Sequence, residues 1–229
     1  MSCEGEKTEP DYLDYLTDEF GDGDEGRPPF RIQPISRRNG MLPTETVEAV
    51  RRYADTDEAW VLFDRDGDDR DANIRRALKE AAAAKIEVGF SHPSFDLWLL
   101  LHFQPFSGAQ SGSSRIVVEK LRSAKGAEAF EDYDKRNDKS VKGVRRDALR
   151  GKQETAVANA RALVGSCGHG ACKAGRAKAE PVGRDAAAEP LPQWSARSGH
   201  APDCPALKRD PSTDVWRLLA ALGIVPHIR

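Results

Sequence analysis

Residues 59–69 read Ala-Trp-Val-Leu-Phe-Asp-Arg-Asp-Gly-Asp-Asp. The apolar run predicts a short strand over 60–63 that ends at Asp64 and Asp66. Side chains in a strand repeat every second residue, so both carboxylates point to the same side of the chain. Two carboxylates at a strand end suit Mg²⁺, which prefers carboxylate oxygen and keeps several waters. Asp and Gly clusters after a strand are more often plain turns, so this stretch alone leaves a turn and a metal site both open.

A calcium-binding loop is excluded by the spacing. Asp64, Asp66 and Asp68 would take its first, third and fifth positions, but the sixth position, which requires Gly, is Asp69. The twelfth position, which requires Glu, is Arg75. We therefore interpret Asp68 and Asp69 as solvent-facing turn residues.

Strand and helix patterns alternate around this stretch. Apolar spacing predicts helices over 8–20, 44–55 and 71–85 and short strands over 30–35, 60–63 and 86–90. The segment 95–103 is apolar almost all round, which predicts a buried helix with Trp98 in the core and His102 as a core histidine. This order predicts an α/β domain with a largely parallel sheet, whose ligands bind beyond the carboxyl ends of the strands.

The 229 residues divide into four predicted parts. An α/β domain occupies 1–104, and a helical, basic extension with helices near 114–123 and 143–164 occupies 105–164. Residues 165–205 are rich in Ala, Gly, Pro and Arg without periodicity, which predicts a flexible insertion. A C-terminal helix is predicted within 206–229, after a capping residue in 211–213.

The charge pattern limits the function. A net charge of −2 argues against a uniformly basic nucleic-acid-binding surface. One basic stretch stands out, and it is predicted either to be a solvated helical face or to follow a phosphate backbone. It contains Lys135, Arg136, Lys139, Lys142, Arg145, Arg146, Arg150 and Lys152. No apolar run approaches the roughly 18 residues of a membrane span and no secretory core precedes the first helix, so we expect a cytoplasmic protein without a membrane partner.

The four cysteines, Cys3, Cys167, Cys172 and Cys204, are too few and too unevenly placed for a disulfide framework. Three of them gather in the sequence with His169 and His200. Their spacing matches none of the closely spaced ligand pairs that are typical of zinc sites. We therefore interpret them as incidental cysteines.

A family resemblance rests on three segments. Cys-Glu-Gly-Glu-Lys-Thr-Glu occupies 3–9, Phe-Asp-Arg-Asp occupies 63–66, and Ser-His-Pro-Ser-Phe-Asp-Leu-Trp-Leu-Leu-Leu-His-Phe occupies 91–103. A Glu-Gly pair before the first helix and Asp-x-Asp after a later strand form the ordered signature of the TOPRIM domain. Together the segments resemble the RloB-like family of TOPRIM proteins, whose third motif reads Ser-Asn-Pro-x-Phe-Glu-x-Trp-Leu-Leu-Leu-His-Phe. The resemblance covers about 1–160 and 211–222.

The resemblance implies a TOPRIM fold, phosphodiester chemistry with Mg²⁺ (or Mn²⁺), and a role in prokaryotic phage defence by abortive infection, often beside a partner ATPase. By position it makes Glu4 the general acid or base and Asp64 and Asp66 the metal ligands. Asp96, the second catalytic candidate, takes the place of the family's Glu and is one methylene shorter, and His92 replaces its Asn. Glu9 is interpreted as a helix N-terminal acid that the helix dipole favours.

The chain departs from the TOPRIM pattern at its start. Only three residues precede Glu4, too few for a typical strand of about five or six. Either the chain begins too late, or the first strand is truncated and holds Glu4 loosely.

Two hypotheses of different classes follow. The first is a metal-dependent nuclease that acts on DNA or RNA, with the nucleic acid bound at Lys135, Lys139, Lys142, Arg145 and Arg146. The second is a non-catalytic binding or regulatory subunit of a defence ATPase complex, whose TOPRIM site is degenerate. The sequence does not determine the oligomeric state.

Overall fold

The computed structural model describes residues 1–109, 113–183 and 186–225. Residues 110–112, 184–185 and 226–229, which belong to the predicted extension, insertion and C-terminal helix, lie outside the described residues.

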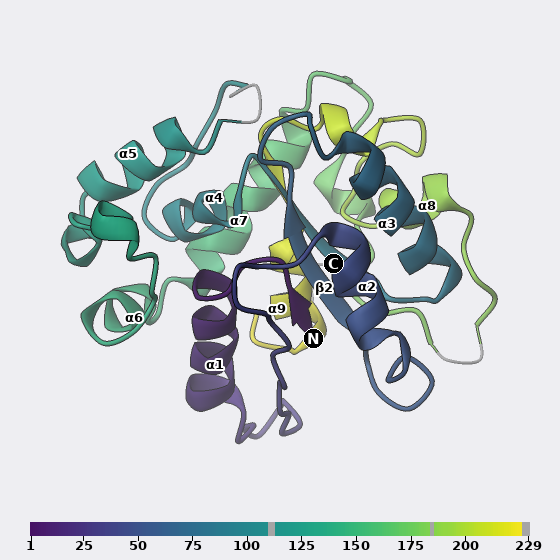
Figure 1. The fold of residues 1–229 in the computed structure, drawn as a ribbon, viewed down its shortest axis with the longest axis horizontal. Coiled ribbons are helices and arrows are strands. Elements are labelled where there is room, and N and C mark those ends of the chain that lie inside the picture. Colours follow the sequence, from purple (N-terminus) through teal and green to yellow (C-terminus); the bar gives the residue numbers. More distant parts are fainter. Residues whose placement is uncertain (110–112, 184–185, 226–229) are drawn as a thin grey trace.

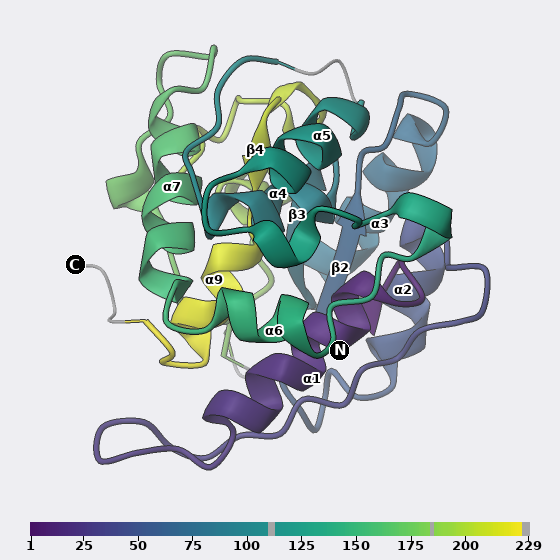
Figure 2. The ribbon, with the colours of Figure 1, turned by 90° about the vertical axis from the view of Figure 1, so that its left-hand side faces the viewer.

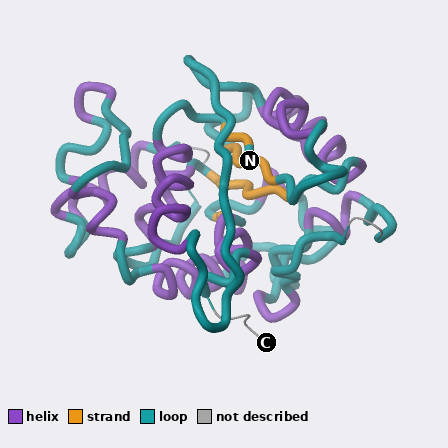
Figure 3. Tube along the Cα trace, turned by 90° about the horizontal axis from the view of Figure 1, so that it is seen from below, coloured by secondary structure: helices purple, strands orange, loops and turns teal. Residues whose placement is uncertain are grey.

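Within the described part, a sheet of four strands runs in the order β1 (Ser2–Cys3), β2 (Trp60–Asp64), β3 (Glu87–His92) and β4 (Ser212–Thr213). β1, β2 and β3 are parallel, and β4 is antiparallel to β3. Figure 3 shows these strands at the centre with helices around them. The prediction of an α/β fold with a largely parallel sheet and a short first strand is confirmed.

Helices cover both faces of the sheet, and successive side chains of β2 point alternately into the core on each face. Trp60 and Leu62 point into the larger core, which also receives side chains from α1 (Thr8–Phe20), α4 (Phe95–Leu101), α5 (Arg115–Ser123), α7 (Gln153–Gly165) and α9 (Val215–Ala221). Val61 and Phe63 point into the smaller core, against α2 (Pro43–Arg51) and α3 (Asp71–Ala83). In Figure 1 these two groups of helices stand on opposite sides of β2. The strand is therefore buried on both faces, as its continuous apolar run predicts.

Gly89 of β3 lies against the Leu62 side chain of β2 and the start of α9. A Cβ at Gly89 would lie 2.5 Å from Leu62 Cδ2 and 3.7 Å from the Cα of Val215. The Leu62 side chain therefore occupies the space that a Cβ at Gly89 would need, whereas α9 would stay at an ordinary contact distance. α9 then completes the larger core with Val215, Trp216 and Leu219.

Several element boundaries differ from the prediction. The helix expected over 143–164 is two helices, α6 (Val144–Leu149) and α7, and Gly151 between them has φ +72°. The stretch 30–35 is not a strand: it is a loop that joins the sheet through one bridge between Ile35 and Ser2. Ser212 and Thr213 form β4 instead of a simple helix cap, because they pair with His92 and Ser91.

The segment 165–205, predicted as a flexible insertion, packs against the α/β layers. α8 (Leu191–Ser195) lies beside α3 (Figure 1), and its Trp194 is buried. Arg197 is buried as well and forms an ion pair with Glu87 of β3 at 3.4 Å. No helix among the described residues is long and apolar enough to cross a membrane.

Candidate active site

A pocket of about 250 Å³ lies where β1 and β2 reach their carboxyl ends. This is the edge at which parallel sheets in α/β proteins bind ligands. Its lining is mainly acidic, with a few basic side chains between the carboxylates. The charged residues of the lining are Glu4, Glu6, Lys7, Glu9, Asp64, Asp66, Arg70, Asp96 and Lys139. Glu4, Asp64, Asp66 and Asp96, predicted from three separate segments, thus share one pocket.

Glu4 is anchored on both sides although β1 has only two residues. Its amide donates to the carbonyl oxygen of Leu62 at 2.9 Å, and its own carbonyl accepts from Met41 at 2.9 Å. The preceding Cys3 donates to Ile35 at 3.0 Å. Of the two alternatives for the short start, a loosely held Glu4 does not agree with these contacts, because the loop before α2 and β2 hold its backbone.

The Glu4 carboxylate bridges two further segments. Its Oε2 accepts from the Asp64 amide at 3.0 Å, and its Oε1 forms an ion pair with Arg70. Burial raises the pKa of Glu4, while the Asp64 amide and the Arg70 charge oppose the shift. Glu4 is thus fixed against the end of β2.

Asp64 is the last residue of β2, and its carboxylate faces the other acids of the pocket. Its Oδ2 accepts from the Phe95 amide at 2.8 Å, at the start of α4. Burial raises the pKa of Asp64 well above its ordinary value, and the charges of Glu9 and Glu4 add to the effect. Asp66 follows one turn residue later and is exposed at the pocket. A site that raises the pKa of carboxyl groups in this way is favourable for a cation.

Glu9 is a pocket residue that the sequence interpretation missed. It lies in the first turn of α1, as the sequence predicts, but its side chain is also buried and its Oε1 accepts from the Gly5 amide at 3.2 Å. A Cβ at Gly5 would lie 2.2 Å from Oε2 of Glu9, so glycine is needed for this approach. Burial raises the pKa of Glu9 to about 7, and the Asp96 and Glu4 charges contribute. The sequence feature that could have indicated this contact is Gly5, four residues before Glu9 and just ahead of α1.

We expect Glu9→Gln to change how stability depends on pH. A carboxyl group with a raised folded-state pKa destabilises the fold as pH rises from its unfolded value near 4.5 to about 7, because its proton is bound more tightly in the folded state. The variant should match wild type near pH 4 and be more stable above pH 7, on the order of 3 kcal/mol. Urea unfolding at both pH values without added divalent cations measures this. Glu6→Gln, with an exposed side chain in the same segment, is the control, and a pH-independent difference would contradict the assignment.

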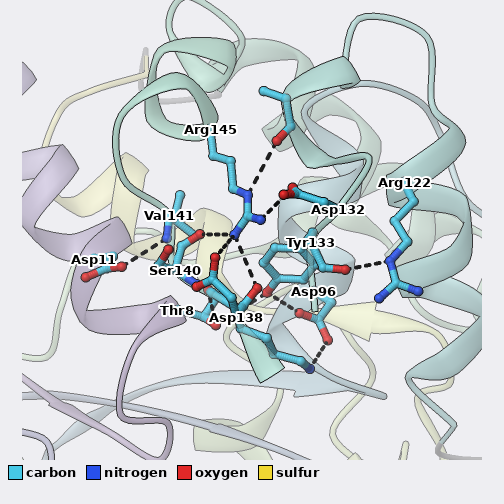
Figure 4. A network of polar contacts seen from close by, with 12 residues as sticks. Thr8, Asp11, Asp96, Arg122, Asp132, Tyr133, Asp138, Ser140, Val141 and Arg145 are labelled. Atoms are coloured by element: carbon cyan, nitrogen blue, oxygen red, sulfur yellow. Dashed lines mark hydrogen bonds and ion pairs between the residues drawn. The ribbon is translucent and has the colours of Figure 1, made fainter. Parts of the chain in front are cut away.

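Three hydrogen-bond donors contact the Asp96 carboxylate, and Figure 4 shows the one from Tyr133. Tyr133 Oη donates to its Oδ1 at 2.6 Å, and Ser94 Oγ and Lys139 Nζ reach its Oδ2 at 3.1 and 3.0 Å. The side chain is only 3% exposed. Asp96 therefore ties α4 to the segment around Lys139, and this segment forms one wall of the pocket.

The predicted nucleic-acid-binding residues have different environments. Lys135 is exposed, Lys142 pairs with Asp11 at 3.2 Å, and Arg146 pairs with Asp18 at 2.7 Å. The last pair joins α6 to α1, which lie side by side in Figure 2. Arg145 is buried, and its guanidinium binds Asp132, Asp138 and nearby backbone carbonyls (Figure 4). Arg145 thus organises the loop 129–140 and does not face solvent.

The two histidines of the third motif lie outside the pocket lining. His102 is buried, with Nδ1 at 2.9 Å from the Trp98 carbonyl and Nε2 at 3.4 Å from Tyr12 Oη. Burial lowers its pKa to about 4, so the predicted core histidine is confirmed and is neutral at physiological pH. His92 is buried between Arg65 and Asp210, at 3.3 and 3.6 Å from Nε2.

The donor set of the pocket fits a hard divalent cation. Asp64 and Asp66 offer carboxylate oxygens from one strand end, and Glu4 and Glu9 raise the negative charge around them. The carboxylates do not form a tight ligand cluster: within the described ranges, the set with all ligand atoms within 4.8 Å of one another lies elsewhere. Mg²⁺ needs only one or two protein carboxylates because it retains water, so Asp64 and Asp66 would be sufficient to hold it.

The fold and this pocket define an α/β protein with an acidic site at the carboxyl ends of parallel strands. The sequence model of the RloB-like proteins matches residues 1–222. Because the match spans nearly the whole chain, the protein belongs to the RloB-like family. No curated protein and no solved structure matches it significantly.

Proposed function

We propose that this chain is a TOPRIM-type, metal-dependent nuclease that cleaves phosphodiester bonds of DNA or RNA in antiphage defence in the cytoplasm. The observation that carries the proposal is the meeting of Glu4, Asp64 and Asp66 in one pocket at the sheet edge. These residues also occur in the chain order of the TOPRIM signature. A surface with a purely structural role would not require the buried Glu9 and the half-buried Glu4 and Asp64 to share one pocket with raised pKa values.

Asp64 and Asp66 are the residues that would hold Mg²⁺ or Mn²⁺. When bound there, the ion supplies positive charge to the scissile phosphate. Glu9, with a pKa of about 7, is suited to accept or donate a proton at neutral pH. Glu4 remains the acid or base that the resemblance implies, and its contact with Arg70 fixes its orientation.

The nucleic-acid backbone would approach along the segment after Tyr133. Asn137 and Lys139 line the pocket, and the exposed Lys135 and Arg136 precede them directly. The two lysines and Arg136 place positive charge beside an acidic pocket, which favours the approach of a phosphate substrate. Lys142 before α6 and Arg146 on α6 extend this segment, although each pairs with an acid of α1, whereas the buried Arg145 is excluded from the surface.

A cleavage assay tests the proposal. Purified full-length chain is incubated with labelled single- and double-stranded DNA and RNA, with Mg²⁺, with Mn²⁺, and without either ion. We expect cleavage of at least one substrate that depends on the added ion. Cleavage that proceeds equally without divalent cations would overturn the metal assignment.

One observation favours the second candidate, a non-catalytic subunit of a defence ATPase complex. Both carboxylates predicted to be catalytic are already paired with cations, Glu4 with Arg70 and Asp96 with Lys139. This candidate predicts binding of the ATPase without turnover under any metal. Ion-dependent cleavage by the isolated chain would remove it.

A further inference from the structure

Three cysteines and a histidine come together far from the acidic pocket's residues in sequence. Cys167, Cys172, His200 and Cys204 each offer one ligand atom, and these atoms all lie within 4.8 Å of one another. The two Sγ atoms of Cys167 and Cys204 are 3.8 Å apart. Nδ1 of His200 is 3.3 Å from Cys172 Sγ and 4.0 Å from Cys204 Sγ.

These separations are those of a tetrahedral zinc site. Zn–S bonds of about 2.3 Å and Zn–N bonds of about 2.0 Å place neighbouring ligand atoms roughly 3.5–3.8 Å apart in a tetrahedron. A disulfide is a poorer description, because its sulfurs would be about 2.05 Å apart and the cysteines here are free. Three thiolates and one imidazole form a closed ligand set, which is typical of structural zinc.

The surroundings of the cluster suit bound thiolates. The Ala201 amide donates to Cys172 Sγ at 3.4 Å, a contact of the kind that orients metal ligands. With Zn²⁺, three thiolates and a neutral imidazole would carry a net charge of −1. The buried guanidinium of Arg209 offsets it, since its Nη2 donates to the Cys204 carbonyl at 2.7 Å. Val164 and Ala201 pack against the sulfurs in a small separate core.

The backbone brings the two halves of the cluster together. Cys167 and Cys172 follow shortly after α7, and His200 comes 28 residues after Cys172, with Cys204 four residues later. The Lys173 amide donates to the Gly199 carbonyl at 2.8 Å. Gly199 has φ +98°, and a Cβ there would lie 2.7 Å from the Lys173 carbonyl oxygen, so glycine is required at this crossing.

We propose that Cys167, Cys172, His200 and Cys204 form a structural zinc site that fastens the segment 165–205 to the end of α7. The interpretation as incidental cysteines considered only local spacing, in which a Cys-x₄-Cys pair and a His-x₃-Cys pair look unrelated. In the folded chain, the two pairs lie next to each other. His169, the histidine nearest in sequence, is not a member: its Nε2 lies 3.5 Å from Asp203.

Elemental analysis of the purified full-length chain tests the proposal. Protein prepared without chelators from zinc-containing medium should hold about one zinc per chain, as a closed four-ligand site does. Cys204→Ala should lose the metal and unfold at a lower temperature. His169→Ala is the matched control in the same segment and should keep it. Asp64→Asn combined with Asp66→Asn should also keep it, which separates this site from the acidic pocket.

A second measurement covers the case in which Cys204→Ala does not fold. Wild-type chain reconstituted with Co²⁺ should show the visible and thiolate charge-transfer absorption of a tetrahedral cobalt–thiolate centre. Wild type with well under one zinc per chain, a cobalt spectrum without thiolate bands, or an intact mass that reveals a disulfide would each overturn the proposal. So would loss of the zinc from the Asp64 and Asp66 variant.

Discussion

Asp64→Asn is expected to abolish ion-dependent cleavage and at the same time to stabilise the metal-free protein. The cleavage rate should fall by more than about 100-fold, because substitution of a residue that merely hydrogen-bonds to a metal ligand already lowers activity by up to about this factor. The stability gain follows from the raised pKa of Asp64, because burial and the Glu9 and Glu4 charges make its ionised form unfavourable. An amide removes that charge with little change in shape.

Paired measurements check both halves of this prediction. Cleavage is followed with and without Mg²⁺, and urea unfolding is measured at pH 8 without added Mg²⁺. Asp68→Asn is the control, because Asp68 is an exposed residue of the turn that follows β2. Loss of activity together with loss of stability would mean that Asp64 supports the fold and would contradict its assignment as a metal ligand.

Arg217→Met is expected to have the largest effect on stability. Glu87 is 2% exposed, and its Oε2 accepts from Arg217 Nη2 at 2.6 Å. Arg197 approaches Oε1 at 3.4 Å. Removal of one partner of a buried ion pair leaves an uncompensated charge and costs about 3–5 kcal/mol. Because Arg197 remains, we expect the lower end of that range.

The midpoint of urea unfolding reports this loss. A Glu87→Gln, Arg217→Met double variant should recover part of it, since Glu87 then carries no buried charge and Arg197 keeps its ion pair with Glu189 at 3.4 Å. Arg75→Met removes an exposed partner of Asp71 and should change stability by less than about 1 kcal/mol. If Arg217→Met is as stable as wild type, Arg197 alone is sufficient to neutralise Glu87.

Local patterns were sufficient to predict much of the fold. The apolar run at 60–63 and the helical spacing at 8–20 and 95–103 correspond to β2, α1 and α4. In these segments the apolar residues follow the pattern expected of a buried strand or helix, and this pattern can be read from the sequence alone. β1 could not be predicted, because two residues have no periodicity and the bridge from Ser2 to Ile35 is a tertiary contact.

The site was predictable to the extent that its residues belong to recognisable motifs. Glu4, Asp64, Asp66 and Asp96 do, whereas Glu9 was hidden by the ordinary preference for acids at helix starts. Charge alone could not separate the exposed Lys135 from the buried Arg145, because burial depends on the loop that Arg145 itself holds together. The Cys and His cluster depends on a chain closure that no local spacing reveals.

The position of β4 has a consequence for biosynthesis. β3 pairs with a strand 122 residues further along the chain, where Ser91 Oγ and Thr213 Oγ1 lie 3.1 Å apart. α9, directly after β4, then closes the larger core. A nascent polypeptide that has not yet emerged from the ribosome as far as 212–221 leaves β3 with an open edge, so the sheet is expected to be completed late.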